Sequence, residues 1–457
     1  MATTPGPRGP RTTQIFAAST LYGVATLAAA LDSGCFAPAY RRLLLLSNNA
    51  YAPETTAPLD TLPGFERLRG RFDGVLSWND TIAPFHPAGW SPRADDTPLW
   101  ERQLRTLWEL GDDRIELALE SIQVNPAQAV AQLFPDAPIT VYADGLMTYG
   151  PTRNKLDPLI GGRARRVLHL DLVPGLKPLL LGEFGVPSEP VATAAFLKVV
   201  SELAVDEVEL GMPADGEPVA LLLGQYLSAL SILTPEQEER LHLRMVRGAA
   251  ARGHRHLVFK PHPSAPAAGS EALAREAAAL GVQLTVLDRP LLAEVLYERL
   301  SPALVVGCFS TALLTASAFY GLPVARVGTE LLLDRLAPYQ NSNRVPVTIA
   351  DALLPPLEQG PDAPPVDLPG LLGAVGYAMQ PELRPDLRGA AERYLAGSLS
   401  AYTWRYFKRR RLTVLGLPGA VPGRLGFVPR NATVRRLARR ARALARNRTL
   451  ARTPARR

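Results

Sequence analysis

Short runs that are apolar at almost every position recur along the chain, and segments with a helical pattern lie between them. Runs of this kind, unlike alternating ones, are typical of parallel strands covered by helices on both faces of the sheet. A first series of predicted strands comprises Gln14–Ala18, Arg42–Leu46, Gly74–Trp78, Ile139–Tyr142 and Val167–Leu172. A second series comprises Val219–Leu223, His256–Lys260, Val282–Leu287, Leu304–Val306 and Pro323–Val327.

A stretch containing glycine and proline, from Gly211 to Pro218, separates the two series. Strands alternating with helices on either side of it predict an α/β protein with two doubly wound parallel sheets. The helices expected in the second half include Glu236–Gly248 and Glu271–Leu280. The predicted units are a first domain over 12–212, a second over 217–353, a proline-rich linker over 354–370, a helical segment over 371–411 and an arginine-rich tail over 412–457.

The amino-terminal region admits two interpretations. Arg8 and Arg11 precede an apolar run, which is also the pattern of a secretory signal peptide. Polar residues interrupt that run, so it is shorter than a membrane-spanning helix needs. We therefore favour a buried strand, a cap at Thr20 and a helix over Tyr22–Leu31 that ends at Gly34, and we expect a cytoplasmic protein.

The net charge of +7 is unevenly distributed. No acidic residue follows Glu392, whereas residues 393–457 contain 18 arginines and lysines. The preceding part has 32 basic and 43 acidic side chains, which leaves it at −11. The composition thus predicts an acidic globular body with a basic tail. Two cysteines, Cys35 and Cys308, are too few for a disulfide framework or a cysteine-based zinc site, and we expect neither a metal nor a cofactor.

Three polar stretches directly follow predicted strands: Tyr142–Gly145, Lys260–Pro263 and Gly307–Thr311. In a parallel sheet, ligands bind beyond the carboxyl ends of the strands, often at the amino terminus of a helix. Taken singly, each stretch has an ordinary structural explanation: a turn, a capping or solvated histidine, and a helix cap. Together they provide a carboxylate in the first domain, and an imidazole and two hydroxyls in the second.

In their order and spacing, Ala143-Asp144-Gly145, His262-Pro263 and Ser310-Thr311 resemble three motifs of the bacterial sialyltransferases, especially the alpha-2,8-polysialyltransferase family. The family motifs are two acids followed by glycine, then His-Pro, then Ser-Ser/Thr. The resemblance covers about residues 12–330. One departure is that Ala143 occupies the position of the first acid. The resemblance implies a GT-B fold, in which two Rossmann-like domains face a cleft.

The resemblance also implies a reaction: inverting, metal-independent transfer of sialic acid, or a related nonulosonate, from a CMP-sugar to a glycan hydroxyl. The acceptor would be polyanionic or lipid-linked, and the product an alpha-2,8-linked capsule or surface polysaccharide. Asp144 is the expected general base and His262 the expected acid or phosphate ligand. Ser310 and Thr311 are expected to bind the donor phosphate, and Lys260, Glu294 and Gln225 the nucleotide.

The basic tail contains a second predicted feature, an amphipathic helix over Thr433–Arg446. It and the aromatic–basic patch near Trp404 suit peripheral contact with an anionic membrane on its cytoplasmic side, or contact with a polyanionic glycan. No recognition motif favours nucleic acid, and a solvated disordered tail is the plain alternative. The residues expected to make such contact are Arg409, Arg410, Arg411, Arg435, Arg436, Arg439 and Arg440.

Two other functions fit the same pattern. A CDP-polyol phosphate polymerase of the teichoic-acid type is another GT-B enzyme with a His-Pro stretch, but such enzymes generally use a second histidine, and no comparable partner for His262 stands out. A protein that binds anionic polymers without catalysis could use the same two domains as a scaffold.

Overall fold

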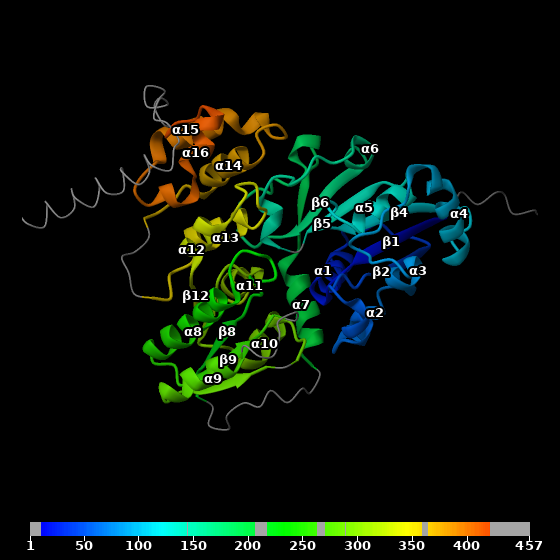
Figure 1. Ribbon diagram of the computed structural model, residues 1–457. Coiled ribbons are helices and arrows are strands. Elements are labelled where there is room, and N and C mark those ends of the chain that lie inside the picture. The colour runs from blue at the N-terminus through cyan, green and yellow to red at the C-terminus, as the bar shows by residue number, and fades with distance from the viewer. Residues whose placement is uncertain are drawn as a thin grey trace, which may run out of the picture.

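Two parallel sheets form the framework of the chain, each in its own domain (Figure 1). The computed structural model describes residues 11–143, 145–205, 217–262, 270–287, 289–358 and 364–420. In both sheets the first strand of the domain lies inside the sheet, and the strand order reverses on its two sides. This is the doubly wound arrangement predicted from the sequence.

The first sheet has seven strands in the order β3-β2-β1-β4-β5-β6-β7. Its interior strand β1 is buried because Ile15 and Phe16 point to opposite faces and both are covered. The strands are β1 (Thr12–Ala18), β2 (Arg41–Leu46), β3 (Gly74–Ser77), β4 (Arg114–Glu120), β5 (Ile139–Ala143), β6 (Ala164–Leu170) and β7 (Ser188–Val191).

All five predicted strands of this domain are confirmed, whereas β4 and β7 escaped prediction. In β4, charged and apolar residues alternate at first, so no long apolar run marks the strand. The edge strand β7 is short and contains Glu189 and Pro190, both exposed. Strand β4 is stabilised despite its polar residues because it is paired with β1 on one side and with β5 on the other. This pairing belongs to the tertiary structure and is not visible in the local sequence.

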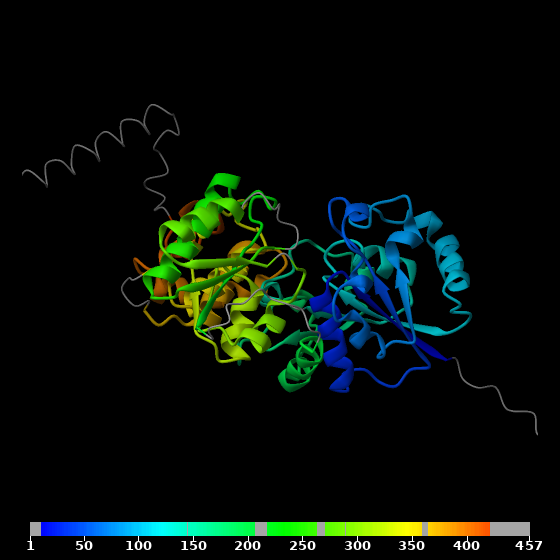
Figure 2. The same cartoon turned by 90° about the horizontal axis from the view of Figure 1, so that it is seen from below.

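Helices cover both faces of the first sheet (Figure 2), and α7 (Thr193–Leu203) contacts α10 (Ala293–Leu300) of the second domain. Thr20 caps the first helix, since its hydroxyl accepts a hydrogen bond of 2.9 Å from the amide of Gly23. Gly34, with φ of +75°, follows the end of that helix, so the predicted strand, cap and helix are confirmed. The helices are α1 (Leu21–Asp32), α2 (Phe65–Arg69), α3 (Trp78–Ile82), α4 (Thr97–Leu107), α5 (Ala127–Leu133), α6 (Pro158–Gly161) and α7 (Thr193–Leu203).

The second sheet has five strands in the order β10-β9-β8-β11-β12, and all five were predicted. The strands are β8 (Val219–Leu223), β9 (His256–Lys260), β10 (Gln283–Val286), β11 (Leu304–Gly307) and β12 (Val324–Arg326). The helices are α8 (Pro235–Ala251), α9 (Ser270–Ala279), α10 (Ala293–Leu300), α11 (Thr311–Ala318), α12 (Thr329–Arg335) and α13 (Arg344–Leu353).

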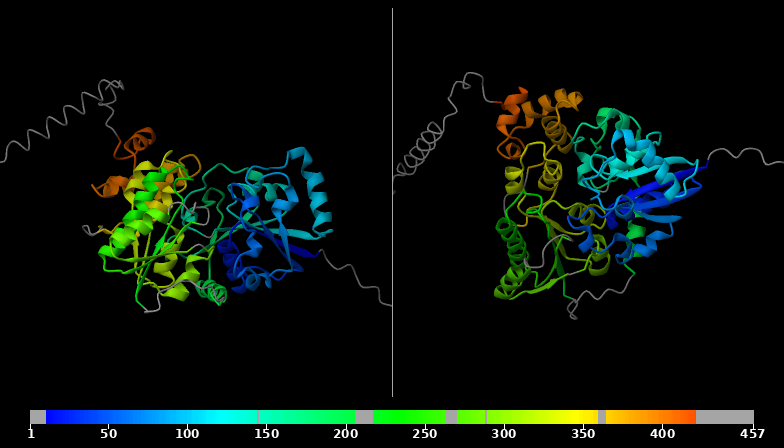
Figure 3. Two further views of the ribbon diagram at one scale, coloured as in Figure 1. Left: turned by 60° about the horizontal axis from the view of Figure 1, so that its bottom comes forward. Right: turned by 45° about the vertical axis from the view of Figure 1, so that its right-hand side comes forward.

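The chain then returns to the first domain through α14 (Leu368–Met379), α15 (Arg388–Ser398) and α16 (Arg409–Leu415). Beyond α14, Arg384 donates a hydrogen bond of 3.0 Å to the carbonyl of Leu179, in the first domain. The right-hand view of Figure 3 shows these orange helices beside both domains. Two Rossmann-like domains joined in this way form the GT-B fold. No helix among the described ranges is long and apolar enough to cross a membrane.

A buried carboxylate, Asp351 on α13, ties the second domain to the carboxyl-terminal helices. Its two oxygens accept hydrogen bonds from Thr329 Oγ1 at 2.6 Å and from the Tyr406 hydroxyl at 2.8 Å. Arg326 Nη1 lies 3.0 Å from Asp351 Oδ1, and this guanidinium is only 3% exposed. Asp351 therefore holds the end of β12, the start of α12 and the segment before α16 together.

We expect Asp351→Ala to lower the free energy of unfolding by about 3–5 kcal/mol, because the variant removes the buried carboxylate from the buried guanidinium of Arg326 and leaves it the half-exposed Glu330 as its ionic partner among the described residues. Asp334→Ala is the matched control, since Asp334 also pairs with the carboxyl-terminal segment, through Lys408, but is 79% exposed. Its removal should change stability by less than about 1 kcal/mol. Denaturant unfolding of both variants measures the difference, and similar losses in the two would contradict this role of Asp351.

Candidate active site

Each of the three polar stretches begins where a strand ends, as the sequence predicts. Strand β5 ends at Ala143, β9 at Lys260 and β11 at Gly307. In the second sheet, β8 lies between β9 and β11, so the ends of these three strands are neighbours. The His-Pro and Ser-Thr stretches therefore leave the second sheet at the same edge.

The structure also brings the stretch of the first domain into contact with that edge. The amide of Leu146 donates a hydrogen bond of 3.4 Å to Thr311 Oγ1. At Gly145 a Cβ atom would lie only 2.9 Å from the same hydroxyl oxygen. Gly145 thus allows close approach between the domains. Asp144, the predicted base, lies outside the described residues, between Ala143 and Gly145.

Ser310 and Thr311 form the amino terminus of α11. The Ser310 hydroxyl accepts a hydrogen bond of 3.3 Å from the amide of Ala312, which makes Ser310 the helix cap. The prediction that Ser310 is a helix cap is therefore confirmed, and a role in ligand binding would be additional to it. Because the first amides of a helix lack intrahelical acceptors, this terminus provides donors and positive potential for an anion.

Gln225 supports the same loop from the end of β8. Its Oε1 accepts a hydrogen bond of 2.9 Å from the amide of Phe309. This contact fixes the turn between β11 and Ser310. The structure therefore places Gln225 beside the Ser-Thr stretch, where its described contact orients the loop.

Two charged residues lie near the start of α11: Lys260, the last residue of β9, and Glu294 on α10, which contacts Thr315 of α11. Glu294 is 2% exposed, and its Oε1 accepts a hydrogen bond of 2.6 Å from Thr315 Oγ1. Burial lowers the pKa of the Lys260 ammonium, while the nearby Glu294 carboxylate raises it. The partial compensation by Glu294 is the physical reason that a lysine is tolerated at this depth.

His262 lies two residues beyond β9 and is exposed as a residue, yet the protein around its ring removes part of its hydration. This desolvation lowers the pKa of His262, the Lys260 ammonium lowers it further, and the Glu238 carboxylate raises it. The neutral imidazole is therefore favoured at neutral pH in the free protein, where it still has one N–H group to donate.

Glu238 is a residue of this region that the sequence analysis missed. It is buried on α8 and accepts a hydrogen bond of 3.1 Å from the amide of Ser228, as well as one from the amide of Leu227. It holds the loop after β8 and acts electrostatically on His262. The available signal was its position on the same helical face as the apolar Leu241 and Met245, where a charged residue is unusual.

The remaining predicted site residues are the arginines expected to contact a membrane or a polyanion. Three of them lie in the described part of the chain, and four lie outside it. Arg411 donates hydrogen bonds of 2.7 and 3.4 Å to the carbonyls of Ala378 and Met379 and so caps the end of α14. Arg409 and Arg410 are exposed, with Arg409 stacked over Trp404. Outside the described residues lie Arg435, Arg436, Arg439 and Arg440.

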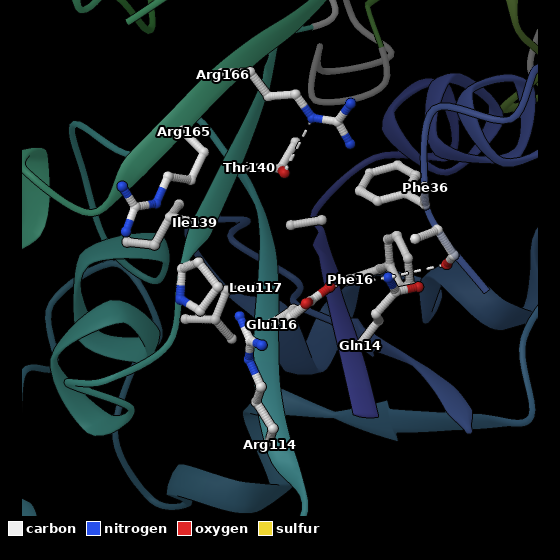
Figure 4. Close-up of a pocket in the computed structure, with 13 residues that line it drawn as sticks. Gln14, Phe16, Phe36, Arg114, Glu116, Leu117, Ile139, Thr140, Arg165 and Arg166 are labelled. Carbon is white, nitrogen blue, oxygen red and sulfur yellow. Dashed lines mark hydrogen bonds between the residues drawn. The ribbon is translucent and has the colours of Figure 1, made fainter. Parts of the chain in front are cut away.

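Within the described part of the chain, no three or more His, Cys, Asp or Glu side chains are grouped so that they could hold a metal ion. A pocket of about 300 Å³ lies at the opposite, amino-terminal edge of the first sheet (Figure 4). Arg114, at the start of β4, and Arg165 and Arg166, at the start of β6, line it together with Glu116. Its position excludes it from the candidate active site.

Comparisons with solved structures give only distant likenesses. The O-GlcNAc transferase of Thermobaculum terrenum is 16% identical, with 88% of this chain and 67% of that chain covered and a TM-score of 0.35. MurG of Acinetobacter baumannii is 12% identical over 86% of this chain and 97% of its own, with a TM-score of 0.38. UDP-GlcNAc 2-epimerase of Methanocaldococcus jannaschii is 12% identical over 69% of this chain and 83% of its own, with a TM-score of 0.39. At such low scores, the fold assignment rests on the strand order.

No curated protein matches the chain. The sequence model of a family does match: that of the alpha-2,8-polysialyltransferases aligns with residues 14–329. This range contains all three polar stretches and both sheets, apart from the first two residues of β1. The match extends over more than half of the chain, and the chain belongs to the alpha-2,8-polysialyltransferase family.

Proposed function

We propose that the protein transfers sialic acid, or a related nonulosonate, from its CMP-sugar to a glycan hydroxyl, in an alpha-2,8 linkage and without a metal. A role in capsule or surface polysaccharide synthesis follows from the same proposal. The observation that carries it is the contact of Gly145 and Leu146 with Thr311. This contact joins the loop after β5 to the start of α11, and it supports the proposal in a chain of the polysialyltransferase family.

The donor phosphate would bind at the amino terminus of α11. The Thr311 amide and hydroxyl are suitable donors, and the helix dipole favours an anion there. His262 would donate its N–H to the same phosphate, and the Lys260 ammonium would attract the phosphate of the nucleotide. These groups would stabilise the negative charge that develops on CMP as it leaves.

Asp144 would accept the proton of the acceptor hydroxyl. The hydroxyl oxygen then forms a bond to the anomeric carbon, and the bond from that carbon to the phosphate oxygen breaks, with its electron pair leaving on CMP. Attack from the face opposite the phosphate inverts the anomeric configuration. The proposal thus gives the first domain the base and the second domain the leaving group.

Replacement of either reacting group tests this division. Asp144→Asn and His262→Ala should each lower the rate of sialyl transfer by about 10²–10⁴-fold, the usual contribution of a general acid or base. His254→Ala is the matched control because His254 precedes the amino end of β9, whereas His262 follows the carboxyl end of the same strand. Its rate should stay close to that of the wild type.

The assay measures CMP release and glycan product from CMP-sialic acid, with EDTA present throughout. Unchanged rates in the Asp144 and His262 variants would falsify the assignment of these residues. Turnover of CDP-glycerol without turnover of CMP-sialic acid would favour a teichoic-acid type polymerase. No turnover of any nucleotide-linked donor would favour a protein that only binds polymers.

The low pKa of His262 predicts a pH dependence of donor binding. Desolvation and Lys260 hold this pKa below its ordinary value in the free protein. A bound phosphodiester adds negative charge and raises it, so the complex binds more protons than the free protein. The affinity for the donor should therefore increase as the pH falls through the pKa of the bound state.

Calorimetry with the inert analogue CMP-3-fluoro-sialic acid, in two buffers of different ionisation enthalpy, measures this proton uptake. We expect up to about one proton per binding event, and much less in His262→Asn. An identical uptake in the wild type and in His262→Asn would show that another group is responsible.

The carboxyl-terminal basic residues would hold the enzyme against an anionic membrane surface. Arg409 and Arg410 are exposed at the last described helix, and the undescribed tail that follows contains most of the remaining excess of positive charge. Residues 1–392 carry −11 and would not be attracted to such a surface by their overall charge.

Vesicle flotation tests this contact with full-length protein. Each well-placed basic residue contributes about 1 kcal/mol, so replacing Arg435, Arg436, Arg439 and Arg440 by alanine should weaken binding to phosphatidylserine vesicles by up to about a thousandfold. Neutral vesicles serve as the control. Equal flotation of the two proteins would exclude the membrane role, and retained binding to soluble polysialic acid would then identify the glycan as the ligand of the tail.

A further inference from the structure

An alpha-2,8 linkage defines what the acceptor brings to the site. The attacking hydroxyl is then on a terminal sialyl residue, and that residue carries a carboxylate. The anion would approach the proposed base, Asp144, at the carboxyl edge of the first sheet, where β4 ends in a further carboxylate, that of Glu120. Binding an anion among carboxylates requires a cation that compensates its charge. The proposed linkage therefore calls for a cation of the first domain at this edge.

Cations are scarce in the described loops that leave the carboxyl edge of the first sheet. Those loops contain Arg93 after β3 and α3, Arg153 and Lys155 after β5, and Lys177 after β6. Arg93 is paired with Asp96, and its side chain is 83% exposed. The arginine-lined pocket of Figure 4 lies at the opposite edge of the sheet, where the strands begin. The candidates for the acceptor anion are therefore in the loops after β5 and β6.

Arg153 is held between the two domains by contacts on three sides. Its backbone amide donates a hydrogen bond to Oε1 of Gln123, in the loop after β4. Its carbonyl accepts one from Nε2 of Gln380, directly after α14. Its Nη1 donates to Ser342 Oγ, in the second domain, at 3.4 Å. The loop that carries Arg153 is also the one that contacts the start of α11, so this guanidinium belongs to the interdomain region of the candidate active site.

The charge of Arg153 has no ionic partner among the described residues. By contrast, the buried Arg326 is paired with Asp351 at 3.0 Å. The Nε atom of Arg153 is buried and makes no hydrogen bond to the described part of the chain, which shows that the guanidinium is partly desolvated. Because Nε is inaccessible, a ligand would meet Nη1, whose bond to Ser342 is long, and Nη2, which is not among the buried atoms. A desolvated, unpaired guanidinium favours an anion with two oxygens.

We propose that Arg153 binds the carboxylate of the terminal sialyl residue of the acceptor and thereby selects acceptors that end in sialic acid. Nη1 and Nη2 form paired hydrogen bonds with the two carboxylate oxygens. The donor also has a carboxylate, but it is attached to the anomeric carbon, next to the phosphate proposed to bind at α11 of the second domain. The inference rests on the proposed transferase function and its linkage, and it adds a specificity-determining residue for the acceptor.

Two acceptors that differ only in this anion test the role. They are alpha-2,8-linked trisialic acid and its analogue in which the carboxylate of the non-reducing terminal residue is replaced by a carboxamide. With full-length protein and CMP-sialic acid, the KM for trisialic acid should be about 10–100-fold lower than that for the carboxamide, the usual effect of hydrogen bonds to a charged group. Equal KM values for the two acceptors would overturn the proposal.

Three variants assign the preference to Arg153. Arg153→Gln should raise the KM for trisialic acid about 10–100-fold and leave that for the carboxamide close to the wild-type value, because only the first acceptor loses an ionic contact. Arg153→Lys should restore part of the preference, since an ammonium keeps the charge but not the paired bonds. Lys155→Gln is the matched control, an exposed cation two residues further along the same loop, and should leave both KM values unchanged. An equal rise for both acceptors in Arg153→Gln, or a larger rise in the donor KM, would overturn the proposal.

CMP release by the wild type distinguishes failure of this inference from failure of the proposed function. If CMP is released but Arg153→Gln and Lys155→Gln have equal KM values for trisialic acid, only the acceptor inference fails. If the wild type releases no CMP with or without acceptor, the transferase proposal itself fails. Saturation-transfer NMR without donor then tests the contact independently of turnover: binding of trisialic acid that Arg153→Gln weakens and Lys155→Gln does not would support the role of Arg153, and equal binding by the two variants would overturn it.

Discussion

The contact between Gly145 and Thr311 is the constraint on which the arrangement of the candidate site depends. The two residues belong to loops that leave different sheets, and a side chain at position 145 would occupy the space of the Thr311 hydroxyl. The absence of a Cβ atom lets the acidic stretch of one domain approach the helix terminus of the other. Every proposed step of the transfer requires this approach, since the base and the phosphate ligands are on different domains.

Electrostatics inside the site are local and do not follow the net charge. Lys260 is desolvated, and the neighbouring Glu294 partly offsets the cost of its charge. His262 is kept in its neutral form by desolvation and by Lys260, with Glu238 acting in the opposite direction. An acidic body can therefore bind an anionic donor through individual hydrogen-bond donors and the dipole of α11, without an overall positive charge. The sharply basic part of the chain lies elsewhere, after Glu392.

Much of the fold could be predicted because buried parallel strands require apolar residues at successive positions. All ten strands marked by such runs are present, including β1 and β8, which lie inside their sheets. Strands β4 and β7 carry polar residues and are stabilised by their neighbours in the sheet, which a local pattern does not reveal. The same limitation applies to Glu238, whose effect on His262 depends on the folding of α8 over the end of β8.

The sequence alone determined the two α/β domains, the three polar stretches at strand ends and the separation of charge between body and tail. These are local properties: they depend on residue type, spacing and order. Only the tertiary structure decided that Gly145 meets Thr311 and that Glu294 is buried against Thr315. Such features depend on which strands become neighbours and on how the two sheets face each other, and contacts between residues far apart in the chain are not encoded in any short segment of it.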